Sequence, residues 1–175
     1  MIPVLIVPGI GNSGPSHWQS IWERKFPALT RVMQRDWDHP ESDLWVVELD
    51  AYIRANESCI IVAHSLGCLV VARWTELHRK KLAGVLMVAI PDPSAPAFPV
   101  EARGFEAVPA RWHGGPLTVV SSNDDPYATP GFTGHCVSAW SAEHVNIGSA
   151  GHINSASGLG DWPAGWAMVD RWRQR

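Results

Sequence analysis

Apolar residues in this 175-residue chain come in short continuous runs, rather than in strict alternation with polar residues. Such runs are typical of strands that are buried on both faces of a sheet. They predict strands over residues 4–7, 31–35, 58–63, 84–90, 117–121 and 142–147. Between them, the spacing of apolar positions and the flanking residues predict helices over residues 16–26, 43–55, 66–77 and 162–172. Ser16 and Gln19 are spaced as a capping box at the start of the first helix.

The alternation of buried strands with helices predicts a three-layer α/β domain, in which helices cover both faces of a mostly parallel sheet. The chain length favours a single domain over residues 1–175. Residues 91–115 are rich in proline and alanine and break this alternation. We interpret them as an irregular excursion over the sheet edge that is too short to form a separate domain.

Composition and charge narrow the class of protein. Hydrophobic residues make up 46% and charged residues 18%, which suits a folded globular chain. The net charge is -3 and there is no basic run, so we expect no nucleic-acid partner. No apolar stretch approaches about 18 residues, and the apolar run at the start is too short for a signal peptide, so we expect no membrane association. Three widely spaced cysteines argue against a disulfide framework and predict a cytoplasmic location.

A candidate nucleophile lies where a predicted buried strand meets a predicted helix. Residues 63–67 read Ala-His-Ser-Leu-Gly, a variant of the G-x-S-x-G nucleophile elbow with alanine in the first glycine position. The residues two before and two after the serine must be small, because neighbouring backbone passes close to this turn. Ser65 is therefore the predicted nucleophile, and the Leu66 backbone N–H is a predicted oxyanion donor at the helix N-terminus. The alternative is that Ser65 only caps the helix.

A serine nucleophile needs a general base, and histidine suits that role near neutral pH. The chain order of this fold is serine, acid, histidine, which leaves five histidines after Ser65. His152 ends a loop of small residues that follows the last predicted strand, and such a loop can bring an imidazole over the sheet. His144 lies inside that strand, and we expect the segment around His135 to be helical as well, so both are poorer candidates. His152 is the predicted base.

The acid that orients the base should follow the predicted strand over residues 117–121. Asp124 and Asp125 both lie there, and Asp125 precedes Pro126, which restricts it to extended backbone. Asp125 is our first choice. Asp124 is its rival, although it could instead bond loop amides in an Asx-turn.

The glycine-rich residues 9–14 have two interpretations. They match G-x-G-x-x-G, and Asp36 lies 22 residues beyond the third glycine, which together resemble a dinucleotide-binding fingerprint. Pro15 follows at once, however, so the glycines lie before the helix instead of leading a pyrophosphate onto its N-terminus. The other interpretation is an oxyanion loop, in which the Ile10 backbone N–H is the second donor that a hydrolase needs.

Several aromatic side chains lie near the predicted active edge of the sheet. The candidates for a pocket are His17, Trp18, Trp37 and His64, and ordinary core packing is the alternative for each. The sequence contains no H-E-x-x-H, C-x-x-C or Walker motif, so it gives no support to a metal or a P-loop.

The ordered set of motifs resembles the family of small α/β-hydrolases, often described as predicted esterases, that includes the retinoblastoma-binding serine hydrolase. The matching pieces are residues 7–9, 14–18, 36–37, 64–67, 124–126 and 151–152, with Pro40 and Trp45. The resemblance implies a compact α/β-hydrolase fold without a large lid, a Ser-Asp-His triad with Asp125 as the acid, and esterase activity on small acyl substrates. The L-x-C-x-E motif of the retinoblastoma-binding member is missing, because residues 66–70 lack the acidic position, so we do not expect its pocket-protein partner.

The prediction from sequence is therefore a serine hydrolase that cleaves small acyl esters with no cofactor, through Ser65, His152 and Asp125. Its expected partner is a small-molecule acyl substrate, and the sequence indicates no oligomeric state. Two alternatives belong to other classes. One is a dinucleotide-binding oxidoreductase that uses residues 9–14, and the other is a binding module on a hydrolase fold.

Overall fold

The structure, a computed structural model, describes residues 2–174 and is built on one six-stranded sheet with the strand order β2-β1-β3-β4-β5-β6. The strands are β1 (Val4–Val7), β2 (Leu29–Arg31), β3 (Ile60–His64), β4 (Gly84–Val88), β5 (Leu117–Ser121) and β6 (Glu143–Asn146). Every pair of neighbouring strands is parallel. The carboxyl ends of all six strands therefore meet at one edge of the sheet.

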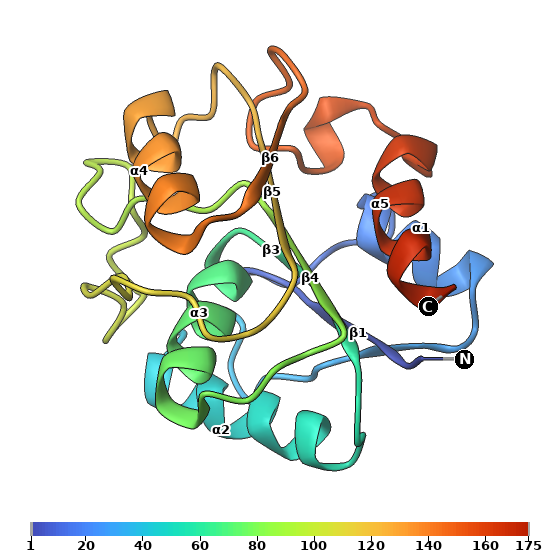
Figure 1. The fold of residues 1–175 in the computed structure, drawn as a ribbon. Coiled ribbons are helices and arrows are strands. Elements are labelled where there is room, and N and C mark those ends of the chain that lie inside the picture. Colours follow the sequence, from blue (N-terminus) through green and yellow to red (C-terminus); the bar gives the residue numbers. More distant parts are fainter. Residues whose placement is uncertain (1, 175) are drawn as a thin grey trace.

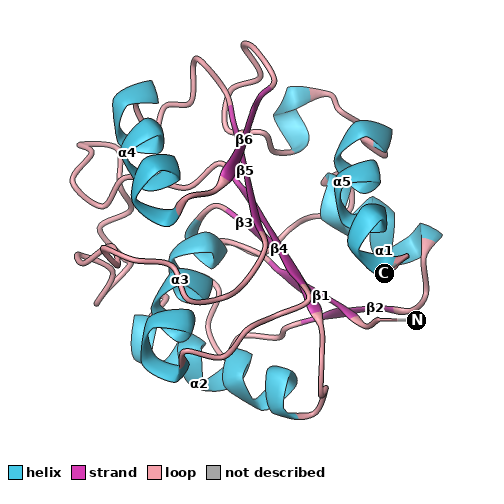
Figure 2. Cartoon of the chain, in the orientation of Figure 1, coloured by secondary structure: helices cyan, strands magenta, loops and turns pink. Residues whose placement is uncertain are grey.

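Helices cover both faces of this sheet, as Figures 1 and 2 show. One face carries α1 (Trp18–Lys25) and α5 (Pro163–Arg173), and the other carries α2 (Ser42–Arg54), α3 (Leu66–His78) and α4 (Pro130–Trp140). A short 3-10 helix, η1 (Ser155–Ser157), follows β6. This arrangement confirms the three-layer α/β prediction. Among the described helices, none is long and apolar enough to cross a membrane.

The core consists of two apolar layers, one on each face of the sheet. In β1, Leu5 and Val7 belong to the layer under α2, α3 and α4, whereas Val4 and Ile6 belong to the layer under α1 and α5. Four tryptophans are among the largest fully buried side chains and divide evenly between the layers: Trp18, Trp22, Trp45 and Trp74. Core packing is therefore the role of these four residues.

The first helix begins later than predicted, and the predicted capping box is wrong. Helix α1 starts at Trp18, and its N-cap is His17, whose Nδ1 accepts a hydrogen bond from the Gln19 amide at 3.2 Å. Ser16 is exposed. The Gln19 side chain turns into the protein, where its Oε1 accepts from the Ser13 hydroxyl at 2.6 Å. The helix cap is thus formed by an imidazole nitrogen, which the hydroxyl-based pattern does not describe.

The second strand also differs from its prediction. Strand β2 covers Leu29–Arg31 and pairs with Val4–Ile6 of β1, and the Val32 amide donates the last bond to Ile6. The predicted strand over residues 31–35 therefore overlaps the observed one at its end only. A three-residue edge strand is too short to produce a periodic pattern.

Residues 91–115 contain no helix or strand, in agreement with the predicted irregular excursion. They extend from the carboxyl edge of the sheet onto the face that carries α2, α3 and α4. Arg103 exchanges backbone hydrogen bonds with Pro40 and Ser42 near the start of α2, and the Trp140 indole of α4 donates to the Pro109 carbonyl at 2.8 Å.

Candidate active site

Ser65 occupies a sharp turn between β3 and α3. Its φ of 55° and ψ of -128° are unusual for a residue with a side chain, and such strain is stored where the surrounding structure enforces it. A Cβ on Gly67 would lie 2.5 Å from the Val7 carbonyl oxygen, and one on Gly9 would lie 2.8 Å from the Ser65 Cβ. The turn therefore requires glycine at both positions. The Ser65 side chain makes no helix-capping hydrogen bond, so the capping interpretation does not apply.

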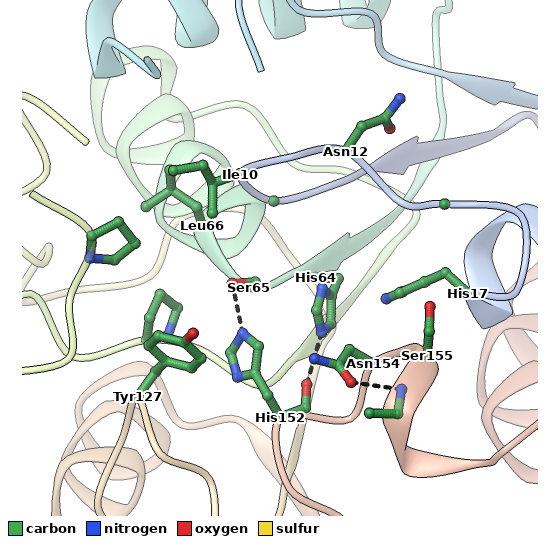
Figure 3. Close-up of a pocket in the computed structure, with 15 residues that line it drawn as sticks. Ile10, Asn12, His17, His64, Ser65, Leu66, Tyr127, His152, Asn154 and Ser155 are labelled. Carbon is green, nitrogen blue, oxygen red and sulfur yellow. Dashed lines mark hydrogen bonds between the residues drawn. The ribbon is translucent and has the colours of Figure 1, made fainter. Parts of the chain in front are cut away.

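A continuous chain of hydrogen bonds joins Ser65, His152 and Asp125. The His152 Nε2 lies 2.7 Å from the Ser65 Oγ, and its Nδ1 lies 2.9 Å from both carboxylate oxygens of Asp125. The side chains of His152 and Asp125 are only 9% and 4% exposed. Because the Asp125 carboxylate can only accept at Nδ1, the proton of a neutral His152 lies there, and Nε2 is free to accept the Ser65 hydroxyl proton (Figure 3).

Asp124 has a different set of partners. Its Oδ1 accepts from the Ser122 hydroxyl at 2.6 Å and from the Gly151 amide at 2.8 Å, and the Ser122 hydroxyl in turn accepts from the Ala150 amide at 2.9 Å. The bond from Ser122 lowers the pKa of the Asp124 carboxyl, and the Gly151 amide adds to that effect. Asp124 therefore holds the loop that carries His152, while Asp125 contacts the imidazole itself.

The two poorer histidine candidates lie away from Ser65. His144 is in β6, where its Nε2 lies 2.8 Å from the Ser121 hydroxyl. His135 is exposed on α4. Of the histidines that follow Ser65 in sequence, His152 is the one that the structure places at its hydroxyl.

Two further histidines, His17 and His64, line the same cavity as His152. The His64 Nε2 lies 2.9 Å from the His152 carbonyl oxygen, and the His17 and His64 rings meet edge-on at 4.7 Å between centroids. Burial lowers the pKa of His17 to about 4, with a smaller effect of the Arg31 charge, and burial also lowers the pKa of His64 well below its usual range. Both rings are therefore neutral at physiological pH. Neutral His64 can then donate its Nε2 proton to the His152 carbonyl.

The backbone amides of Ile10 and Leu66 are the predicted oxyanion donors. Both residues line the same cavity as Ser65 and lie on one side of it in Figure 3. Neither amide donates a hydrogen bond to any residue between 2 and 174. Leu66 is also the first residue of α3, where the helix dipole favours negative charge. The two N–H groups are thus available to a negatively charged oxygen near Ser65.

The glycine-rich loop, residues 9–14, lies next to the turn that carries Ser65 and is held there by hydrogen bonds. The Gly11 amide donates to the Trp37 carbonyl at 2.8 Å, and the Arg31 guanidinium donates to the Asn12 side chain at 2.6 Å while pairing with Glu23. The Asp36 carboxylate accepts from backbone amides of its own turn and is exposed. In this structure, therefore, residues 9–14 pack beside Ser65, and Asp36 caps a surface turn.

The cavity beside Ser65 has a volume of about 380 Å³. Two of the predicted pocket residues, His17 and His64, line it together with Ser65 and His152. Trp18 and Trp37 do not line it, which corrects their prediction. Trp18 is fully buried and donates its indole N–H to the Ile153 carbonyl, and Trp37 packs edge-on against Trp45.

Sequence reasoning missed several residues of the cavity wall, namely Pro91, Pro99, Tyr127, Asn154 and Ser155. Tyr127 and Asn154 each lie two positions after a predicted site residue, so their place in sequence is a usable signal. The two prolines belong to the irregular segment 91–115, and no pattern in the sequence marks them.

The parallel six-stranded sheet, the strained serine turn and the histidine beyond the last strand define an α/β hydrolase. The family described as serine hydrolase matches residues 4–171, and the chain belongs to that family. Both findings confirm the predicted fold class and the resemblance to small α/β-hydrolases. No curated protein sequence matches the chain.

Solved structures of similar fold support this assignment. A YdeN-like hydrolase from Pectobacterium atrosepticum is 29% identical, with a TM-score of 0.88 over 99% of this chain and 91% of that one. The ydeN gene product of B. subtilis is 20% identical, with a TM-score of 0.86 and full coverage of both chains. A monoacylglycerol lipase from Paleococcus ferrophilus is 14% identical, with a TM-score of 0.71 over 98% and 95% of the two chains. At 20% and 14% identity, the latter two structures show similarity of fold alone.

Proposed function

We propose that the protein is a carboxylic ester hydrolase that cleaves small acyl esters through a Ser65–His152–Asp125 catalytic triad. The observation that carries the proposal is the hydrogen-bond chain from Asp125 through His152 to the Ser65 hydroxyl, at 2.9 and 2.7 Å. The free amides of Ile10 and Leu66 in the same cavity support it. The cavity volume of about 380 Å³ lies at the small end of ligand sites, which favours short acyl groups.

The first half of the reaction transfers the acyl group to the enzyme. The Ser65 Oγ attacks the ester carbonyl carbon while His152 accepts the hydroxyl proton, and the carbonyl oxygen becomes an oxyanion held by the Ile10 and Leu66 amides. The bond to the leaving oxygen then breaks, and His152 gives its proton to that oxygen. Asp125 stabilises the imidazolium without taking a proton. The products are a free alcohol and an acyl ester on Ser65.

The second half repeats these steps with water. His152 removes a proton from a water molecule as the water oxygen attacks the acyl carbon. The Ser65–acyl bond breaks, His152 returns the proton to Ser65, and the carboxylic acid leaves. No cofactor takes part in this cycle.

Covalent labelling tests the nucleophile directly. We expect a fluorophosphonate probe to label the wild-type protein, and Ser65→Ala to lose both the label and the hydrolysis of p-nitrophenyl butyrate. Ser58→Ala is the matched control, because Ser58 is exposed at the surface, and it should label normally.

The general base is tested by kinetics. His152→Ala should lower kcat/KM on p-nitrophenyl butyrate by at least about a hundredfold, as expected for loss of a positioned general base.

The alternatives make different predictions in the same experiment. Micromolar binding of NADH without labelling would favour a dinucleotide-binding oxidoreductase. Labelling of Ser65 without turnover across a panel of short-chain aryl esters would favour a binding module on a hydrolase fold.

We also propose that the protein is cytoplasmic. Cys59, Cys68 and Cys136 are free and buried, and free thiols are usual in reducing compartments. Burial raises the pKa of Cys59 to about 11, so its thiol stays protonated and unreactive. Fractionation of cells that express the protein, followed by immunodetection, tests the location.

A further inference from the structure

The cavity beside Ser65 has two chemically different sides. In Figure 3, Ile10, Leu66 and Tyr127 lie on one side of the Ser65 and His152 pair, and His17 and Ser155 lie on the other. Apart from the Tyr127 hydroxyl, the side chains of the first side are aliphatic and aromatic carbon, whereas those of the second are an imidazole and a hydroxyl. A substrate whose carbonyl carbon reaches Ser65 would therefore meet apolar surface in one direction and hydrogen-bonding groups in the other.

His17 is the distinctive group on the polar side. The residue is only 4% exposed, and its Nε2 atom is buried without a hydrogen-bond partner among residues 2–174. Its other ring nitrogen is engaged, because Nδ1 accepts the hydrogen bond from the Gln19 amide that caps α1. A nitrogen that accepts a hydrogen bond carries no proton. In a neutral imidazole the proton must then be on Nε2, so His17 presents an N–H donor.

No acceptor of the described residues lies within hydrogen-bond reach of this donor. The neighbouring His64 uses its Nε2 on the His152 carbonyl, and the Asn154 side-chain oxygen accepts from the Ala156 amide at 2.9 Å. Buried polar groups without partners cost free energy and are rare in folded proteins. Because His17 also lines the cavity, an acceptor on a molecule bound there would satisfy Nε2.

We propose that His17 is a specificity-determining residue, and that the natural substrates are small esters with an acceptor oxygen, ether or hydroxyl, that receives the His17 Nε2–H bond. This inference rests on the proposed esterase function and narrows its substrate class to amphipathic esters. The hydrocarbon part of such an ester contacts Ile10, Leu66 and Tyr127, and the oxygen-bearing part lies toward His17. The acceptor can belong to the acyl group or to the alcohol, and the two sources are separated by experiment.

Matched substrate pairs isolate the hydrogen bond. In the acyl series, p-nitrophenyl methoxyacetate is compared with p-nitrophenyl butyrate, and in the alcohol series, 2-methoxyethyl butyrate is compared with butyl butyrate. Each pair exchanges one methylene group for an ether oxygen at nearly constant size. The measured quantity is the ratio of kcat/KM for the oxygen-bearing ester to that for its hydrocarbon partner, in wild type and in each variant.

Two variants remove the donor in different ways. His17→Asn keeps a side-chain oxygen that can accept from the Gln19 amide, so the α1 cap is retained while the shorter side chain no longer places a donor where Nε2 was. His17→Phe keeps the ring volume and loses the donor. The comparison of ratios cancels effects of either substitution that are common to both substrates.

We expect both variants to lower the ratio about three- to tenfold in one of the two series, the usual worth of a neutral hydrogen bond. The series in which it falls identifies the part of the ester that His17 contacts. If the ratio changes less than about twofold in both variants and in both series, the inference is overturned. Hydrolysis of p-nitrophenyl butyrate by the wild-type protein would in that case still support the esterase function. Absence of all hydrolysis in wild type, together with no fluorophosphonate label on Ser65, overturns both.

Discussion

At the residue scale, the adjacent aspartates after β5 illustrate how one position in the chain separates two roles. Asp125 bonds the imidazole of His152, and Asp124 bonds the loop that carries it. Proline at position 126 does not by itself decide between them. The geometry does, because one carboxylate faces the ring and the other faces the Gly151 amide.

Asparagine substitutions at these two positions should differ greatly in effect. We expect Asp125→Asn to lower kcat/KM on p-nitrophenyl butyrate by at least about a hundredfold, because an amide can donate at the imidazole and favour the wrong tautomer. Asp124→Asn keeps an oxygen that can accept from Ser122 and Gly151, and we expect a loss of less than about tenfold. Comparable losses in the two variants would contradict the assignment of the acid.

His17 should also make stability depend on pH. Its pKa falls from an ordinary 6.5 to about 4 on folding, so the unfolded chain binds more protons than the folded chain between these values. The stabilisation is full above pH 6.5 and is lost as the pH falls toward 4. Between pH 7.5 and pH 5.0, we expect this one residue to account for about 2 kcal/mol of lost unfolding free energy.

Urea unfolding at the two pH values measures this effect. His17→Asn lacks the titratable ring, so its loss of stability on acidification should be smaller than that of wild type by about that amount. An equal loss in wild type and variant would show that His17 is not buried in its neutral form.

Residue roles differ in how far the sequence predicts them. Ser65 was predictable because a strand, small flanking residues and a helix coincide around it. The donor state of His17 was not, because it depends on which ring nitrogen the α1 amide contacts. Tautomers are set by three-dimensional neighbours.

At the element scale, the junction of β3 and α3 is the most constrained part of the site. Gly67 lies in the first turn of α3, and a Cβ there would meet the backbone carbonyls of Val7 and Pro8 at 2.5 and 2.6 Å. Backbone atoms of a central strand cannot give way as the end of a flexible side chain can. The close packing of β1 against α3 therefore depends on this glycine.

Gly67→Ala should accordingly lower the unfolding free energy by about 2 kcal/mol or more, within the range for overpacked sites, and reduce ester hydrolysis by displacing Ser65. Gly134→Ala is the matched control, since Gly134 is also helical and has open space around its Cβ position. It should be neutral or stabilise by up to about 1 kcal/mol. Thermal denaturation of both variants, followed by circular dichroism, tests the contrast.

Elements with a strong pattern were predicted closely, and those set by a few local bonds were not. The predicted strand over residues 117–121 coincides with β5, because its apolar run is bounded by turn residues. The start of α1 and the extent of β2 depend on the His17 cap and on a three-residue pairing with β1. Neither leaves a periodic signal.

At the scale of the whole molecule, the layer of α1 and α5 is held by clustered tryptophans. Trp22 stacks with Trp162 at 5.9 Å between centroids, and Trp172 of α5 is buried against Gly84 at the start of β4.

Trp172→Ala should lower the unfolding free energy by about 3–5 kcal/mol, the usual cost of removing a large buried aromatic. Val100→Ala, at a residue that is 89% exposed, should change it by less than about 0.5 kcal/mol. Urea titration monitored by far-UV circular dichroism tests both.

The site brings together residues that are far apart in the chain. Ser65 follows β3, Asp125 follows β5 and His152 follows β6, and parallel strands place all three loops at the same edge. This convergence follows from topology, and the alternation of strands and helices predicts it. The cavity wall from residues 91–115 could not be predicted, because its shape depends on contacts with three helices and on no repeating pattern.

Residues 91–115 also have a consequence for how such a protein can diversify. Pro91 and Pro99 contribute to the cavity wall from a connection without helix or strand, whereas Ser65 and His152 lie on turns braced by the sheet. Insertions and exchanges are tolerated best in such connections. Changes in this one connection would therefore give homologues new substrate preferences while the residues around Ser65 stay the same. Residues 91–115 are therefore the first segment to randomise when the aim is to alter substrate preference.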